Sequence, residues 1–264
     1  MTNDDDLVEF EARGCVLPTD TQWSVLSSGG ALLAHASWGA GPAVLLLHGG
    51  LGNASNWGKQ IPFLRAQGFR VIAMDTRGHG RSTRDARPFS YEQLAEDACA
   101  LLDHLGVERA AFVGWSDGAC TSLAAAKLAP ERVRGVFFFA CNVDEDGTLP
   151  FEMTPVIGRC FSRHMKDYQA LSATPEAWNG FVEDVGSMQR SQPRYGAEDL
   201  ASVKVPVLVA LGEHDEFIRP EHAEYLAKTI PGASLTRLPG VSHFAPLQRP
   251  SSFNDVLLRW LREL

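Results

Sequence analysis

A single serine lies between two glycines in the sequence G-W-S-D-G at residues 114–118. The motif directly follows the apolar run Ala111–Val113 and precedes a stretch of small residues, Ala119–Ala126. The flanking glycines let the backbone turn tightly, so a serine at such a strand-to-helix turn has an exposed hydroxyl. We therefore identify Ser116 as a candidate nucleophile. The alternative is a tight turn without chemistry.

A serine hydroxyl is a weak nucleophile at neutral pH and needs a base within hydrogen-bond reach. His243 lies in the sequence G-V-S-H-F-A-P, after the short apolar run Ala233–Leu238 near the end of the chain. This position satisfies the order serine, acid, histidine that accompanies a G-x-S-x-G motif. We predict that His243 is the general base, against the alternative of a loop histidine with no role in the chemistry.

The base must be oriented by an acid, which we expect after the preceding strand. The apolar run Val207–Leu211 is followed by G-E-H-D-E, where Asp215 is the first candidate. Glu213 and Glu216 are rivals in the same loop, and Asp144 is a further one because it follows the neighbouring strand. Spacing alone does not decide among these four acids, since the choice depends on geometry.

Acyl transfer also requires N–H donors for the oxyanion of the tetrahedral intermediate. The N–H of Asp117 is one, and the loop H-G-G-L-G at residues 48–52 is expected to supply the second from Gly50 or Leu51. This loop lacks the G-x-G-x-x-G spacing of a dinucleotide site. His48 itself is predicted to be a structural hydrogen-bonding residue.

The segment D-T-R-G-H-G-R-S at residues 75–82 is dense in turn-forming and hydrogen-bonding residues. We assign it a structural role. An ion pair between Asp75 and Arg77 is expected to brace the loop beneath the serine turn.

The elements that must position these residues follow a strand–turn–helix rhythm, which is typical of a mostly parallel sheet flanked by helices. The strands are nearly continuous apolar runs, as expected when both faces of a sheet are covered. The predicted strands are Val44–Leu47, Val71–Met74, Ala111–Gly114, Val133–Ala140 and Val205–Leu211, preceded by an antiparallel hairpin of Gln22–Leu26 and Leu32–Ser37. The predicted helices are Trp57–Gln67, Tyr91–Leu105, Ala119–Leu128, Glu221–Thr229 and Ser252–Leu264.

Residues 142–200 break this rhythm with polar turns, several prolines and short amphipathic segments. We interpret them as a helical cap inserted into a core domain made of residues 1–141 and 201–264; the alternative is a helical subdomain with no substrate role. The apolar side chains of this insertion either line a pocket over Ser116 or form the core of the cap. They are Phe151, Met153, Phe161, Met165, Tyr168, Trp178, Phe181 and Met188. As substrate-binding residues we select Asp117, Trp115, Phe151, Trp178 and Phe244.

Composition excludes several classes of function. The chain of 264 residues is 45% hydrophobic and carries a formal net charge of −8, without the clustered Lys and Arg that a nucleic acid requires. It has no apolar run of membrane-spanning length, and its acidic start is unlike a secretory signal. The five cysteines form no C-x-x-C, and the eight histidines show no H-x-x-x-H, so we expect no bound metal. We also expect no cofactor. Because the chain shows neither a secretory signal nor a disulfide framework, we expect a cytoplasmic location. The sequence indicates no particular oligomeric state.

The combination of H-G-G, D-x-R-G-x-G-x-S and G-W-S-D-G with a late acid and histidine resembles the α/β-hydrolase superfamily over nearly the whole chain. This resemblance implies the α/β-hydrolase fold, a mostly parallel eight-stranded sheet flanked by helices with a small helical cap. Haloalkane dehalogenases and epoxide hydrolases of this fold use an aspartate as nucleophile, so Ser116 places the chain in the serine branch.

Within this branch, G-W-S-D-G-A with a short cap resembles the biphenyl-hydrolase-like esterases of the valacyclovir hydrolase type. The resemblance implies that Asp117 binds the ammonium group of an amino-acid ester. The alternative is that Asp117 only supplies its N–H and caps the following helix. The H-G-G loop departs from the pattern of that relative, which weakens a transfer of its substrate to this chain.

The sequence thus predicts a serine hydrolase that cleaves a small carboxylic ester, including lactones and amino-acid esters, through an acyl-enzyme. Hydrolysis of a C–C bond, and haloperoxidase or perhydrolase chemistry without a cofactor, are alternatives on the same three residues. A ligand-binding protein of the same fold is the alternative that involves no catalysis.

Overall fold

The computed structural model describes residues 5–264. Its eight strands form one sheet in the order β1-β2-β4-β3-β5-β6-β7-β8. The strands are β1 (Ser24–Ser28), β2 (Ala31–Trp38), β3 (Ala43–Leu47), β4 (Arg70–Met74), β5 (Ala110–Trp115), β6 (Val133–Phe139), β7 (Val207–His214) and β8 (Ser234–Ser242). Strand β2 is antiparallel to both of its neighbours, and the strands from β4 to β8 are parallel to one another. The predicted α/β-hydrolase architecture is therefore confirmed.

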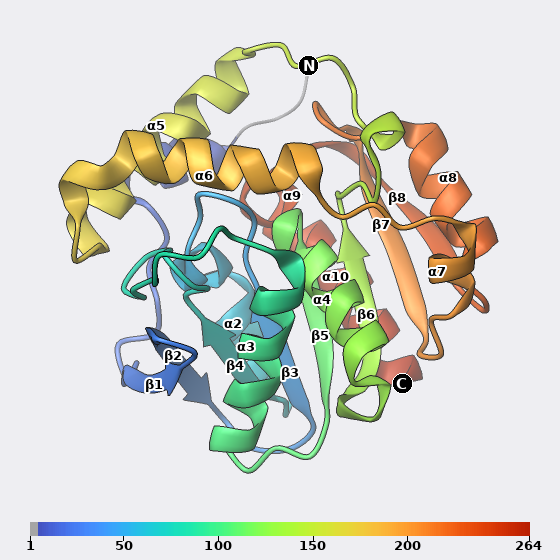
Figure 1. Ribbon diagram of the computed structural model, residues 1–264, viewed down its shortest axis with the longest axis horizontal. Coiled ribbons are helices and arrows are strands. Elements are labelled where there is room, and N and C mark those ends of the chain that lie inside the picture. Colours follow the sequence, from blue (N-terminus) through green and yellow to red (C-terminus); the bar gives the residue numbers. More distant parts are fainter. Residues whose placement is uncertain (1–4) are drawn as a thin grey trace.

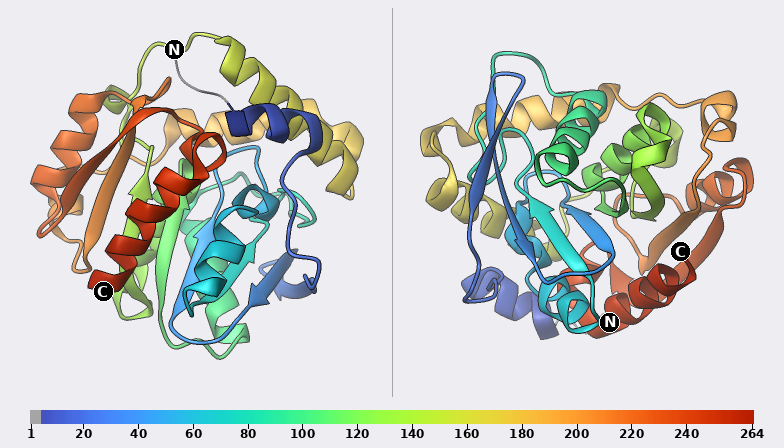
Figure 2. Two further views of the ribbon diagram at one scale, coloured as in Figure 1. Left: turned by 180° about the vertical axis from the view of Figure 1, so that it is seen from behind. Right: turned by 90° about the horizontal axis from the view of Figure 1, so that it is seen from below.

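Helices cover both faces of this sheet (Figure 1). The helices are α1 (Asp5–Arg13), α2 (Gln60–Ala66), α3 (Tyr91–His104), α4 (Asp117–Leu128), α5 (Pro155–Leu171), α6 (Trp178–Ser191), α7 (Ala197–Ala201), α8 (Pro220–Thr229), α9 (Ala245–Gln248) and α10 (Pro250–Glu263). Four short 3-10 turns are η1 (Ala54–Trp57), η2 (Pro130–Arg132), η3 (Glu145–Gly147) and η4 (Pro175–Ala177). Helices α3 and α4 lie on one face, and α2 and α10 lie on the other (Figure 2).

Burial on both faces explains the continuous apolar strands. In β6, Phe137 and Phe139 are fully buried and both contact Phe253 of α10, with ring centroids 5.5 Å and 5.2 Å apart. Phe138, whose side chain alternates to the other face of the strand, is also buried. Each side chain of this strand therefore packs against one of the two layers that cover the sheet.

The ends of the helices follow local signals that were visible in the sequence. Ser90 precedes α3 and its side chain accepts a hydrogen bond from the N–H of Gln93, which satisfies a free donor of the first turn. Pro220 occupies the first position of α8, where its missing N–H costs nothing. Most predicted boundaries differ from the observed ones by one to three residues; for example, α4 begins at Asp117 instead of Ala119, and η1 takes the place of the first residue predicted for α2.

The inserted segment crosses the end of the sheet to which the parallel strands point (Figure 1). Its helices α5 and α6 lie over the carboxyl ends of the central strands, the place where ligands bind in open α/β sheets. The division into a core and a cap of residues 142–200 stays a prediction.

Two predictions concern the start of the chain and membranes. Residues 1–4, which open the acidic N-terminal sequence, lie outside the described residues. None of the helices between residues 5 and 264 is long and apolar enough to cross a membrane.

Candidate active site

Ser116 occupies a strained turn between β5 and α4. Its backbone angles are φ 53° and ψ −123°, a region that residues other than glycine rarely adopt. The turn is held because the N–H of Ser116 donates to the carbonyl of Phe139 at 2.8 Å, and its carbonyl accepts from the N–H of Ala119 at 2.7 Å. Strain of this kind, held by its surroundings, is typical of functional sites.

Both glycines of the motif are required because neighbouring backbone atoms approach them too closely for a side chain. A Cβ atom on Gly114 would lie 2.2 Å from the carbonyl oxygen of Gly118, and one on Gly118 would lie 2.0 Å from that of Leu47. Both distances are far below van der Waals contact. Helix α4 therefore starts directly against β5 and β3, which fixes the position of Ser116.

His243 follows β8 and is paired with Asp215, which follows β7. The Nδ1 atom of His243 lies 3.0 Å from Oδ2 and 3.2 Å from Oδ1 of Asp215, and both side chains are buried. The carboxylate of Asp215 also accepts the N–H groups of Phe217 and Ile218, each at 2.9 Å. These two backbone donors hold the acid in place beneath the imidazole.

The pKa of His243 is raised above its ordinary value by its acidic neighbours. Burial of the ring favours the neutral form, but the negative charge of Asp215 and the hydrogen bond with it outweigh this effect. Glu216, whose carboxylate accepts the backbone N–H of His243 at 2.9 Å, raises the pKa further, as does Asp117. An imidazole in this setting is suited to accept a proton.

The other three candidate acids do not reach the imidazole. Glu213 accepts the N–H of Gly240 at 2.7 Å at the surface. Glu216 contacts the backbone of His243. Asp144 caps η3 and lies 3.8 Å from another histidine, His222. Among these acids, the structure brings Asp215 alone to the His243 ring.

The loop after β3 runs close to the serine turn. A Cβ atom on Gly49 would lie 3.1 Å from the Cβ of Ser116, and Leu51 has a positive φ of 62°. Within the described residues, the N–H groups of Gly50, Leu51 and Asp117 donate no hydrogen bond. All three residues border the same cavity as Ser116, so these donors are available to a ligand there.

His48 has the structural position that the sequence predicts. Its Nδ1 lies 2.8 Å from the carbonyl of Gly49, and its Nε2 accepts the N–H of Thr76 at 3.1 Å. Burial lowers the pKa of His48, so the ring is neutral. The ring therefore ties the loop after β3 to the loop after β4.

The predicted ion pair between Asp75 and Arg77 is wrong. Arg77 is buried and pairs with Asp97 of α3 at 2.7 Å and with Asp85 at 3.1 Å. Asp75 instead accepts the N–H of Ala54 at 2.7 Å and pairs with Arg81 at 3.0 Å. The segment is a bracing element, as expected: Arg77 reaches α3, while Asp75 pairs with Arg81 inside the segment and accepts an N–H of η1.

Asp117 is a buried carboxylate beside the serine. It accepts hydrogen bonds from the hydroxyl of Tyr91 at 2.9 Å and from the side-chain amide of Gln189 at 3.0 and 3.2 Å. Burial raises the pKa of Asp117 to about 6, although these donors and His243 oppose the shift. The carboxylate is thus mostly charged at neutral pH and faces the cavity.

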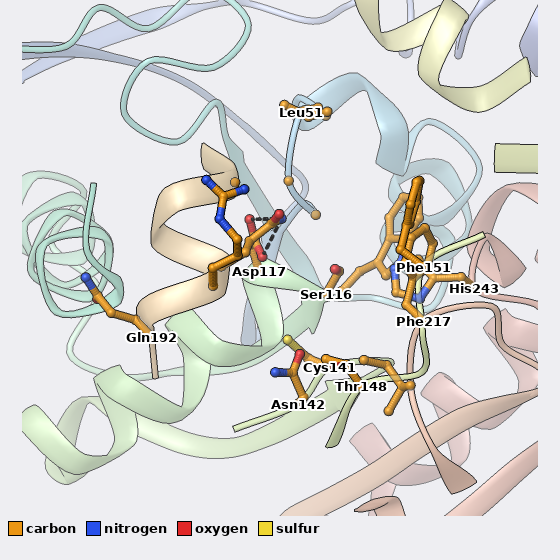
Figure 3. A pocket seen from close by; sticks show the side chains of 18 of the residues that line it. Leu51, Ser116, Asp117, Cys141, Asn142, Thr148, Phe151, Gln192, Phe217 and His243 are labelled. Carbon is orange, nitrogen blue, oxygen red and sulfur yellow. Dashed lines mark hydrogen bonds between the residues drawn. The ribbon is translucent and has the colours of Figure 1, made fainter. Parts of the chain in front are cut away.

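A cavity of about 810 Å³ joins these groups (Figure 3). Ser116, His243, Gly50, Leu51 and Asp117 all line it. The proposed substrate-binding residues Trp115, Phe151 and Phe244 also line it, as do Met153 and Phe161 of the inserted segment.

Trp178 does not reach the cavity. It packs against Phe161, Tyr168 and Phe181, with ring centroids 5.4, 5.4 and 5.9 Å apart. The other apolar side chains named in the sequence, Met165, Tyr168, Phe181 and Met188, are likewise absent from the lining. The inserted segment therefore uses one part of its aromatic set for its own core and another for the cavity.

Several lining residues were missed in the sequence. They are Cys141, Asn142, Thr148, Leu149, Ile157, His164, Gln189, Arg190, Gln192, Arg194, Phe217 and Ile218, among others. The residues after β6 and β7 had a usable signal, because the carboxyl ends of parallel strands meet at one edge of a sheet. The polar residues of α6 had no such signal in the sequence, because their orientation depends on how the helix packs.

Among residues 5–264, no group of His, Cys, Asp and Glu side chains is arranged to hold a metal ion.

A mostly parallel sheet that carries a serine at a strained strand-to-helix turn, with a histidine–aspartate pair at the ends of later strands, has the architecture of an α/β hydrolase. Residues 42–187 match the family described as alpha/beta hydrolase fold. The chain belongs to this family, which confirms the resemblance found in the sequence.

Two relatives and one solved structure are similar to this chain over most of their own length. Serine hydrolase BPHL of Homo sapiens is 29% identical over 240 residues, which cover 86% of this chain and 82% of the relative. The 3-oxoadipate enol-lactonase 2 of Acinetobacter baylyi is 28% identical, over 85% of this chain and 91% of the relative. The solved structure of Est816, described as an N-acyl homoserine lactone degrading enzyme, has 29% identity and a TM-score of 0.71, and covers 89% of this chain and 99% of that one.

Proposed function

We propose that this protein hydrolyses carboxylic esters, including lactones, through an acyl-enzyme on Ser116. The observation that carries the proposal is the His243–Asp215 pair, whose histidine borders the same cavity as a serine held in a strained turn. The names of two similar proteins, an enol-lactonase and a lactone-degrading enzyme, support an ester bond as the target.

The mechanism assigns one role to each group. His243 takes the proton of Ser116 as its oxygen attacks the ester carbonyl, while Asp215 holds the imidazole and stabilises its positive charge. The oxyanion is bound by the N–H groups of Asp117 and Gly50, with Leu51 as the neighbouring donor. His243 then gives the proton to the leaving alcohol, and the same steps with water release the acid.

Amino-acid esters are a narrower substrate class, and Asp117 is the observation that favours them. Its carboxylate lies at the cavity next to the proposed nucleophile, and its pKa of about 6 leaves it charged at neutral pH. An ammonium group in the cavity would gain a charge-assisted hydrogen bond there.

The test is labelling with a fluorophosphonate, followed by intact-protein mass spectrometry. We expect a single adduct in the parent and none in Ser116→Ala. Ser187→Ala, an exposed serine of α6, is the control and should label like the parent. Hydrolysis of p-nitrophenyl esters of increasing acyl length should be lost in Ser116→Ala alone. An adduct that persists in Ser116→Ala would overturn the assignment of the nucleophile.

A further inference from the structure

Two cysteines meet beside the serine turn. Cys120 lies on the first turn of α4, and Cys141 lies two residues after the end of β6. Their Sγ atoms are 3.0 Å apart, and both side chains are buried. We refer to Cys120 and Cys141 as the dithiol pair.

The hydrogen bonds of the dithiol pair give its members different roles. The thiol of Cys120 donates to the carbonyl of Asn142 at 2.9 Å. The thiol of Cys141 is then the donor in the contact between the two sulfurs, so a lone pair of Cys120 faces Cys141. This lone pair points along the line of the bond that would join the two sulfurs, and Cys120 must lose its proton as that bond forms.

Access to the dithiol pair is also unequal. Cys141 and Asn142 line the cavity (Figure 3). Cys120 is fully buried and does not line it. Burial raises the pKa of Cys120 well above its ordinary value, which keeps this thiol protonated. A reagent in the cavity therefore meets Cys141 first.

We propose that the dithiol pair is an oxidation site, at which a peroxide that enters the cavity converts the two thiols into a disulfide. The sulfur of Cys141 attacks one peroxide oxygen, the O–O bond breaks, and the sulfur is oxidised to sulfenic acid while the other oxygen leaves as water or alcohol. The sulfur of Cys120 then attacks that of Cys141, the S–O bond breaks, and the hydroxyl leaves as water with the thiol proton. Two thiols and one peroxide thus give one disulfide.

Little movement is needed for this reaction. A disulfide bond is about 2.05 Å long, so the sulfurs must approach by about 1 Å from their separation of 3.0 Å. The bond would join α4, which starts at Asp117, to the segment after β6, whose Phe139 carbonyl holds the N–H of Ser116. The crosslink would therefore connect the two segments that fix the serine turn. This proposal does not depend on the hydrolytic function.

The test is oxidation of the reduced, folded chain by hydrogen peroxide, followed by denaturation in iodoacetamide and mass spectrometry. The parent has five cysteines, and formation of the disulfide leaves three to be alkylated. Peptide mapping should find the Cys120 and Cys141 peptides joined, and a dithiol reductant should separate them. Failure of this disulfide to form, or accumulation of sulfinic acid on Cys141 in its place, would overturn the proposal.

Three variants separate the steps. Cys120→Ala should stop at a sulfenic acid on Cys141, which dimedone traps. Cys141→Ala should leave Cys120 unoxidised, since the buried thiol is shielded from the cavity. Cys99→Ala is the matched control, because Cys99 lies in α3, and it should form the disulfide as the parent does. Oxidation of Cys120 in the Cys141→Ala variant at the rate seen in the parent would contradict the order of the two steps.

Discussion

His243 and Asp215 follow a pair of residues that are already in register between two neighbouring parallel strands. The pairing of β7 and β8 shifts register between Gly212 and His214, and His214 then pairs with Ser242. These two residues end their strands, and Asp215 and His243 follow directly. The hydrogen bond of 3.0 Å between them therefore follows from the pairing of the strands. The geometry of the site depends on the sheet and not on a flexible loop.

Asp215→Asn is the first prediction. The amide keeps the shape of the carboxylate but not its charge, so it holds the imidazole in the wrong tautomer. We expect kcat for a p-nitrophenyl ester to fall by about three to four orders of magnitude. Asp144→Asn is the matched control, because Asp144 lies beside His222 and should retain the activity of the parent. Loss of activity in Asp144→Asn with retention in Asp215→Asn would reverse the assignment.

The second prediction concerns pH. Hydrolysis requires neutral His243, and its pKa is raised, so kcat/KM should fall on the acidic side with a midpoint above about 6.5. Glu216→Gln removes one of the charges that raise this pKa while the amide oxygen still accepts the N–H of His243. We expect the midpoint to move to lower pH with kcat near that of the parent. A profile that does not move in Glu216→Gln would remove Glu216 from the electrostatics of the site.

Gly50→Ala is the third prediction. The added Cβ would lie 2.6 Å from both the Oδ2 of Asp117 and the Nε2 of Gln189, so the loop or these side chains must shift. Since the N–H of Gly50 is a proposed oxyanion donor, we expect kcat to fall by at least about tenfold. Gly180→Ala on α6 is the control, because its Cβ meets nothing within 4 Å. Equal activity of the two variants would place the oxyanion away from Gly50.

Asp117→Asn tests the narrower substrate class. The measurement is the ratio of kcat/KM for an α-amino ester to that for its analogue without the amine. We expect the ratio to fall, because the variant loses the charge that an ammonium group would pair with, while neutral esters retain their rate within a few-fold. An equal loss for both substrates would show instead that Asp117 has a structural role, through Tyr91 and Gln189.

The parts of the molecule that the sequence predicted are those set by local patterns. The strand before Ser116, the glycines on either side of it and the small residues after it lie within a few positions of one another, and each is required by packing visible in the structure. The position after the predicted strand Val205–Leu211 placed Asp215 first among the candidate acids. The register of β7 and β8, which brings it to His243, is a property of the assembled sheet.

The parts that the sequence did not predict depend on contacts between distant segments. Arg77 finds its partner Asp97 on another helix, so the nearby Asp75 was the wrong choice. Trp178 and Phe161 lie on different helices of the same insertion, yet only Phe161 reaches the cavity. Helix α1 was not predicted, because it is stabilised by burial of Leu7 and Phe10.

His164 gives the last prediction, which concerns stability. It is buried against Phe10, and burial lowers its pKa to about 3, with smaller contributions from His48 and Arg163. In the unfolded chain a histidine titrates near 6.5. Between these two values the unfolded chain binds a proton that the folded chain does not, so the free energy of unfolding falls as the pH falls. Above this window His164 makes no such contribution, and below it the loss is complete.

His164→Phe should therefore reduce the acid sensitivity of the fold. The free energy of unfolding, measured by urea titration followed by tryptophan fluorescence, should fall less steeply between pH 6 and 4 than in the parent, by up to about 1.4 kcal/mol per pH unit. The aromatic ring is kept, so its packing on Phe10 is retained. His214→Phe removes an exposed histidine and should keep the slope of the parent. If His164→Phe and the parent lose stability with the same slope, then His164 is protonated in the folded protein within this range, and the neutral ring inferred from its burial is wrong.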